Sequence, residues 1–283
     1  MIKNTLKDFI DFVIYPNDNQ INISLKSKLS LFIIMFFLYC LLIIIFLIPL
    51  LELIYEISKL SGNTNVYLTL PTTIFFFVFL IPFIEELIFR YFLRYNGIKT
   101  MMIGHKKWLE IFPKLVYGSS ICFGFLHLTN FPNPTYIFFL LSPLIILPQI
   151  IIGFFISYLR VRLNFLWGVF FHCLWNFMAL IVIPYINYSL ADAHIEKAIN
   201  HTIIIESQLF FNEEKQALKI DSINGKVKNV NATHYSLQQI VDTLYKKDTF
   251  IIDDELINLK FESKNGLTKL EFRKILEKIF LIR

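Results

Sequence analysis

Two adjacent glutamates, Glu85 and Glu86, lie in an apolar stretch of the chain that is long enough to cross a membrane. An ionisable side chain at the centre of a bilayer costs about 2.5 kcal/mol or more, so two of them in one such stretch indicate a functional site. Arg90 follows Glu86 by four residues and shares its helical face, where the two can form an ion pair that is functional or purely structural. Glu85 projects about 100° away around the helix and is free to face another segment.

Two histidines lie in two further apolar segments. His127 ends the sequence Phe123-Gly-Phe-Leu-His127, and His172 begins the sequence His172-Cys-Leu-Trp-Asn176. In each sequence the first and last residues are four positions apart and therefore share one helical face. Three predicted helices thus offer carboxylates, imidazoles and an amide to a common interior.

This combination of side chains is suited to the hydrolysis of a peptide bond. Such hydrolysis needs a nucleophile, a proton acceptor and a stabiliser for the oxyanion. A glutamate can act as the base, one histidine can hold the attacking water, and the second histidine with the asparagine can donate hydrogen bonds to the carbonyl oxygen. Alternatively, a glutamate and both histidines bind a zinc ion whose water attacks the peptide. The residues by themselves leave both mechanisms open.

The elements that must position these residues are membrane-spanning helices. Of the 283 residues, 55% are hydrophobic and 17% are charged, whereas about a quarter are charged in an average soluble domain. The fourth apolar stretch contains Pro143 and Pro148, and Pro148 could divide it, so six spans are the alternative to five. The five stretches that qualify or nearly qualify as spans are residues 29–55, 70–93, 112–128, 136–159 and 165–185.

We therefore predict an all-α polytopic membrane domain at 29–190, preceded by a polar segment at 1–28 and followed by a small α+β extramembrane domain at 195–283. The C-terminal domain shows no recognisable catalytic constellation, and its role as a lid or partner-binding module is left open, as is its partner. Its predicted strands are residues 202–211, 226–230, 249–252 and 256–262, and its predicted helices are residues 236–245 and 267–280.

Basic residues cluster at alternate ends of the predicted spans. They precede the first span and follow the second and the fourth, whereas the loops at the opposite ends hold only Lys59. The positive-inside rule then places the N-terminus in the cytoplasm and the C-terminal domain outside. The many Ile, Lys, Asn and Phe residues are typical of a low-GC bacterial genome, so we expect a bacterial cytoplasmic membrane protein. The net charge of +5 is explained by these anchors, and no nucleic-acid partner is predicted.

The three motifs, in this order, resemble those of the CPBP family of intramembrane proteases, also called the Abi family. It contains the type II CAAX prenyl endopeptidases and bacteriocin-processing and immunity proteins. The family patterns Glu-Glu-x-x-x-Arg, Phe-x-x-x-His and His-x-x-x-Asn/Asp match residues 85–90, 123–127 and 172–176. The resemblance covers about residues 70–187 and implies motif helices that surround a polar cavity.

The resemblance also implies a role for each motif residue. Glu85 would activate water together with His127, and His172 and Asn176 would stabilise the oxyanion. Two further residues of the first motif would support the site, namely Glu86 and Arg90. If a metal is used, zinc being the candidate, its ligands would be Glu85, His127 and His172; a mechanism without a cofactor is equally open.

These observations predict an intramembrane endopeptidase, of glutamate type or a metalloprotease, acting on a peptide or protein substrate within the lipid bilayer. A prenylated C-terminal peptide and a leader peptide are both candidate substrates, and a bacterial origin makes the first less expected. The alternatives are a non-proteolytic immunity or scaffold protein of the same fold and a proton-coupled transporter using Glu85 and Glu86. The sequence lacks the internal repeats typical of such transporters.

Overall fold

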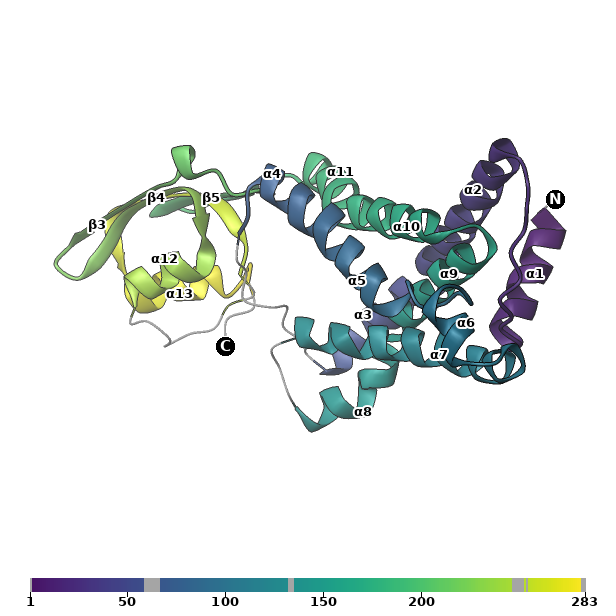
Figure 1. Ribbon diagram of the computed structural model, residues 1–283. Helices are drawn as coiled ribbons and strands as arrows, with labels where there is room; N and C mark the ends of the chain where they lie inside the picture. The colour runs from purple at the N-terminus through teal and green to yellow at the C-terminus, as the bar shows by residue number, and fades with distance from the viewer. Residues whose placement is uncertain (1, 59–66, 132–134, 246–251, 253, 281–283) are drawn as a thin grey trace. The chain divides into compact units, whose positions relative to one another are not determined.

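The computed structural model describes residues 2–58, 67–131, 135–245, 252 and 254–280 and shows long helices and a small sheet (Figure 1). Two compact units are formed, one from the helices within residues 2–58 and 75–177, the other from residues 67–74 and 178–280. The predicted fold class, a helical membrane region of about five spans with a small sheet-containing C-terminal domain, is confirmed. The helical segments long and apolar enough to span are Leu25–Ile54, Leu70–Phe89, His105–Asn130, Tyr136–Arg162 and Phe165–Leu190.

Three of the spans contain a π-helical stretch directly before a proline. Pro49, Pro82 and Pro184 each occupy the second position of the α-helix that follows such a stretch. Proline has no N–H and its ring clashes with the carbonyl four residues earlier, so the preceding turns widen. The segments are α2 (Leu25–Leu42), η1 (Ile43–Leu47) and α3 (Ile48–Ser58) in the first span, α4 (Leu70–Thr73), η2 (Ile74–Leu80) and α5 (Ile81–Phe89) in the second, and α10 (Phe165–Phe177), η4 (Met178–Val182) and α11 (Ile183–Leu190) in the fifth.

The fourth span is one kinked helix. Helix α8 (Tyr136–Ile145) and α9 (Leu147–Arg162) meet at Ile146, whose φ and ψ are −89° and 0°. Pro148 lies in the first turn of α9, where its missing N–H would have no helical partner. The described chain thus has five candidate spans, and the six-span alternative is not supported. Between the second and fourth spans lie α6 (Ile98–Met102), α7 (His105–Leu126) and the 3₁₀ turn η3 (His127–Asn130), of which α7 and η3 form the third span.

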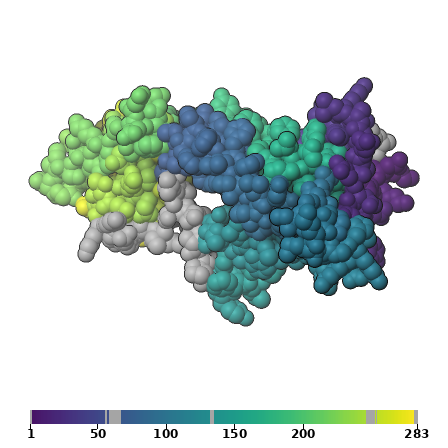
Figure 2. Space-filling model, in the orientation of Figure 1, coloured from purple at the N-terminus to yellow at the C-terminus, as the bar shows by residue number. Residues whose placement is uncertain are grey.

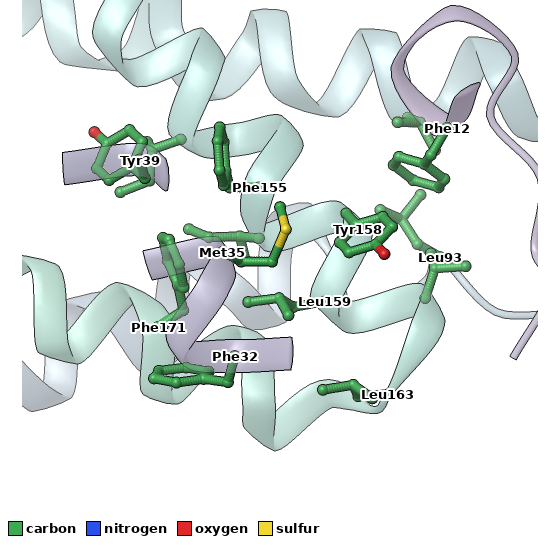
Figure 3. Close-up of a cluster of buried hydrophobic side chains, with 14 of the residues drawn as sticks. Phe12, Phe32, Met35, Tyr39, Leu93, Phe155, Tyr158, Leu159, Leu163 and Phe171 are labelled. Carbon is green, nitrogen blue, oxygen red and sulfur yellow. The ribbon is translucent and has the colours of Figure 1, made fainter. Parts of the chain in front are cut away.

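The N-terminal segment contains a helix that was not predicted, α1 (Ile2–Ile14). Its Phe12 is fully buried in the main core of the helical unit, where aromatic side chains from four helices meet (Figure 3). This core joins α1, α2, α9 and α10 and so fixes the scaffold on which the motif helices sit. Its largest members include Phe12, Phe32, Met35, Tyr39, Phe155, Tyr158 and Phe171.

The C-terminal unit is a five-stranded antiparallel sheet in the order β1-β2-β5-β4-β3, with α12 (Leu237–Leu244) and α13 (Lys269–Leu276) packed on it (Figure 1). Both helices contribute to one apolar core with the central strands. The strands are β1 (His194–Lys197), β2 (His201–Ser207), β3 (Ala217–Ile223), β4 (Lys226–Ser236) and β5 (Leu256–Thr268), and the 3₁₀ turn η5 spans Glu213–Lys215.

Predicted strands at 202–211, 226–230 and 256–262 correspond to β2, β4 and β5, and the predicted helices at 236–245 and 267–280 correspond to α12 and α13. The predicted strand at 249–252 lies outside the described residues apart from Ile252. Strands β1 and β3 were not predicted. They are the two edges of the sheet. Strand β1 has only four, mostly exposed residues, and in β3 the alternation of apolar and polar residues is confined to residues 218–221.

Candidate active site

The end of α5 carries a fully buried ion pair between Glu86 and Arg90. The Nη1 atom of Arg90 donates to Oε1 of Glu86 at 3.0 Å, as the spacing of four residues predicted. The guanidinium also lies over the ring of Phe123 from α7, 4.0 Å from its centroid. Because both charges are removed from water, each needs the other, and the aromatic face adds a further favourable contact for the cation.

His172 of α10 lies between the two glutamates. Its Nδ1 is 2.9 Å from Glu86 Oε1, and its Nε2 is 3.5 Å from Glu85 Oε2. The imidazole is buried, whereas the Glu85 side chain remains 15% exposed. Glu86 is therefore enclosed by Arg90 and His172, and Glu85 is the carboxylate with access to the surroundings.

This geometry decides how protons are distributed in the pair. A carboxylate accepts, so Nδ1 of His172 donates to Glu86, and a neutral ring then presents a lone pair at Nε2. A lone pair facing an ionised Glu85 would be repelled, so the arrangement requires a proton on Nε2 or on Glu85. The two side chains are thus close enough to share one proton.

His127 follows the last turn of α7 and lies against the same aromatic ring as His172. The centroid of Phe123 is 4.6 Å from that of His127 and 5.6 Å from that of His172. The Nδ1 atom of His127 is 2.9 Å from the carbonyl oxygen of Phe123. Because a carbonyl only accepts, Nδ1 carries the hydrogen and Nε2 keeps the lone pair. His127 can therefore accept a proton or a hydrogen bond at Nε2.

Asn176 lies one turn beyond His172 on α10 and reaches the second span. Its Nδ2 donates to the carbonyl oxygen of Phe77 at 2.8 Å. A carbonyl in a π-helix normally pairs with the N–H five residues later, and for Phe77 that residue is Pro82, which has none. The second N–H of the amide is left to donate to another acceptor.

The motif helices are held together by close backbone contacts through α9. A Cβ atom on Gly168 of α10 would lie 3.2 Å from Ile156 Cγ2, and one on Gly124 of α7 would lie 2.6 Å from Ile150 Cγ1. At the end of α5, Arg160 of α9 donates from Nε to the carbonyl of Arg90 at 3.1 Å. Helix α9 carries no motif residue, yet it sets the spacing of the three helices that do.

The three motifs thus converge in the helical unit. That Glu85 and His127 act on one water molecule stays a prediction. Glu85 faces His172. Among the described residues, no hydrogen bond or ion pair joins Glu85 directly to His127. In a comparison with protein families, a model described as type II CAAX prenyl endopeptidase Rce1-like matches residues 67–178, which include all three motifs. We call residues 67–178 the Rce1-like region after the family model that they match. The predicted resemblance to the CPBP family is confirmed.

The match supports a CAAX-protease type of function for the Rce1-like region in general terms, in a chain with five helices that can span a membrane. Comparisons with curated proteins and with solved structures gave no match. Within the described residues, no group of three or more His, Cys, Asp or Glu side chains is arranged to hold a metal ion. The candidate zinc ligands Glu85, His127 and His172 are not arranged as a ready-made site.

Two residues of the Rce1-like region that were not predicted support the first motif. A Cβ atom on Gly153 would lie 3.0 Å from Arg90 Nη2 and 3.1 Å from Ser120 Cβ. Arg160, with its backbone contacts to Arg90 and Tyr91, joins the ends of α9 and α5. A glycine among large apolar residues and a buried arginine within a span are signals that the sequence does contain.

Proposed function

We propose that the Rce1-like region is an intramembrane endopeptidase in which Glu85 and the two histidines hydrolyse a peptide bond. The observation that carries this proposal is the placement of His172 between Glu86 and Glu85. One carboxylate is neutralised by Arg90 and orients the ring, and the other is accessible and has no lysine or arginine paired with it among the described residues. An oriented histidine beside a free carboxylate is suited to proton transfer.

In the proposed reaction Glu85 removes a proton from a water molecule, whose oxygen attacks the carbonyl carbon of the peptide. Nε2 of His127 accepts a hydrogen bond from the same water and positions it. The developing oxyanion accepts hydrogen bonds from the protonated Nε2 of His172 and from the free N–H of Asn176. When the C–N bond breaks, Glu85 delivers the proton to the leaving amine, so the products are one carboxylic acid and one amine.

The test is a cleavage assay in proteoliposomes, with prenylated C-terminal peptides and leader peptides offered as separate substrates. For the variants Glu85→Gln, His127→Ala and His172→Ala we expect cleavage to fall by about 10² or more. Glu52→Gln is the matched control, because Glu52 is an exposed glutamate of the first span. Cleavage that survives all three changes would refute the proposed site. Absence of cleavage of every peptide by the wild type would favour a non-proteolytic member of the family.

A further inference from the structure

Helix α1 has three longitudinal sectors. Thr5 and Phe12 are buried, and Asp8 and Phe9 beside them are partly buried. Four large apolar residues, spaced by four along the second sector, are between 39% and 61% exposed: Ile2, Leu6, Ile10 and Ile14. The third sector is polar and exposed, and contains Lys3, Asn4, Lys7 and Asp11. Isolated exposed apolar residues are ordinary, but a continuous stripe of four beside a polar face is typical of a helix at an apolar boundary.

The buried sector holds α1 firmly to the end of α9. Arg162 donates from Nε to Oδ2 of Asp8 at 2.9 Å and from Nη2 to Oδ1 at 3.0 Å, so the pairing is bidentate. The hydroxyl of Tyr158 also donates to Asp8, at 2.8 Å. Phe9 and Phe12 pack on the ring of Tyr158. Because both oxygens of the Asp8 carboxylate accept hydrogen bonds, α1 cannot rotate to bury its apolar stripe without losing these contacts.

Helix α1 lies beside the end of the fourth span and just before the first span. Arg162 is the last residue of the fourth span, and the first span begins at Leu25, shortly after α1 ends. Helix α1 has 13 residues and is about 20 Å long, too short to cross a bilayer core of about 30 Å. In the view of Figure 1 it runs crosswise to α7 and α10, and part of this N-terminal region is at the surface in Figure 2.

The charges and neighbours of the stripe indicate what covers it. Lys3 and Lys7 flank it on the polar side, and Lys26 and Lys28 lie at the start of the first span. Exposed apolar residues continue along α2 at the same end, again with a spacing of four, at Leu25, Leu29 and Ile33. Exposed apolar residues at the start of a span are suited to contact with acyl chains, and a lipid surface there would offer the stripe on α1 an apolar cover and the four lysines anionic headgroups.

We propose that α1 is an interfacial anchor of the membrane domain. Ile2, Leu6, Ile10 and Ile14 insert into the boundary between headgroups and acyl chains, and Lys3 and Lys7 bind anionic headgroups while Asp11 faces water. The helix therefore lies in the plane of the membrane, tied through Asp8 and Arg162 to the helix that positions the motif helices. This proposal does not depend on peptidase activity.

The test uses the full chain in lipid nanodiscs with its three cysteines replaced by alanine. A nitroxide is attached through Leu6→Cys or Ile10→Cys on the stripe and, as matched neighbours, through Lys7→Cys or Asp11→Cys. For each nitroxide we compare the frequency of collisions with oxygen to the frequency of collisions with a water-soluble nickel complex. We expect this ratio to be several-fold higher at the stripe than at its neighbours. Equal access of the nickel complex at all four positions would overturn the proposal. So would low access of both reagents at the stripe, since that indicates a protein cover.

A second measurement covers the case in which the cysteine-free chain does not fold. A photo-crosslinking residue is placed at position 6 or at position 7 of the otherwise natural chain in vesicles. Lipid adducts from position 6, with several-fold fewer from position 7, support the anchor, whereas equal yields or adducts to protein alone refute it. Replacing anionic by zwitterionic lipid should lower the yield at position 6, and Lys3→Gln with Lys7→Gln should remove that dependence.

Discussion

The imidazole of His172 donates from Nδ1 to Glu86 at 2.9 Å, on the same carboxylate oxygen that accepts from Arg90 at 3.0 Å. Two adjacent glutamates thereby acquire different surroundings. Glu86 is enclosed and ionically paired, whereas Glu85 faces the other nitrogen of the same ring and retains some exposure. A structural and a reactive carboxylate are thus separated by one residue of helix.

We expect Glu85→Gln and Glu86→Gln to differ in stability, although both should lower cleavage. Loss of the Glu86 charge leaves Arg90 buried without its counterion, which costs about 3 kcal/mol or more. Glu85 pairs with no lysine or arginine among the described residues and is partly exposed, so the free energy of unfolding of Glu85→Gln should lie within about 1 kcal/mol of that of the wild type. Thermal unfolding of the purified variants in one detergent measures this difference. Equal destabilisation by both changes would show that the two carboxylates are not divided in this way.

Gly153→Ala should destabilise the protein and lower cleavage. The added methyl group would lie 3.0 Å from Arg90 Nη2 and 3.1 Å from Ser120 Cβ, and buried overpacking of this kind costs about 1–3 kcal/mol. The control is Gly118→Ala in α7, because a Cβ there has no neighbour within 4 Å and alanine favours a helix. Unfolding midpoints and cleavage rates of the two variants are compared. A neutral Gly153→Ala would show that Arg90 is not confined from this side.

The attachment of α1 should weaken in acid. Partial burial opposes ionisation of Asp8, but its hydrogen bonds with Arg162 and Tyr158 more than offset this and lower its pKa below the usual 3.8. A carboxyl with a lowered pKa in the folded state stabilises the fold above its unfolded pKa, and this contribution is lost as pH falls through the folded value. The Asp8 side chain is 42% exposed, so the contribution is no more than ~1 kcal/mol.

The measurement for Asp8 is the free energy of unfolding of the wild type minus that of Asp8→Asn as a function of pH. The difference should be constant near neutral pH and decrease below 3.8. Tyr158→Phe keeps the ring packing and removes one hydrogen bond to the carboxyl, so it should shift the decrease to higher pH. A difference that does not change with pH would contradict this role of the carboxyl.

The basic residues predict the orientation of the chain. A reporter active only outside the cytoplasm should be active when fused after residue 190 and inactive when fused in the loop between the second and third spans, which is rich in lysine and arginine. The second fusion is the internal control for expression. Activity of a cytoplasm-only reporter after residue 190 would reverse the prediction.

The sequence by itself determined the features that depend on neighbours along the chain. Span length and hydropathy predicted five helices, and a spacing of four residues predicted the Glu86–Arg90 pair. Both follow from helix geometry and transfer free energy, which need no knowledge of other segments. The stripe on α1 also has a local pattern, but the interspersed lysines and aspartates obscured it.

Only the tertiary structure decided which motif residues meet. That His172 lies against both glutamates, and that His127 joins it through Phe123, depends on how far α7 and α10 are rotated and on how closely they approach α9. Those quantities are set by packing at Gly124, Gly153 and Gly168, and such packing arises between residues far apart in the sequence. The edge strands β1 and β3 were missed for a related reason: their apolar patterns are short, and pairing with a neighbouring strand is what makes them strands.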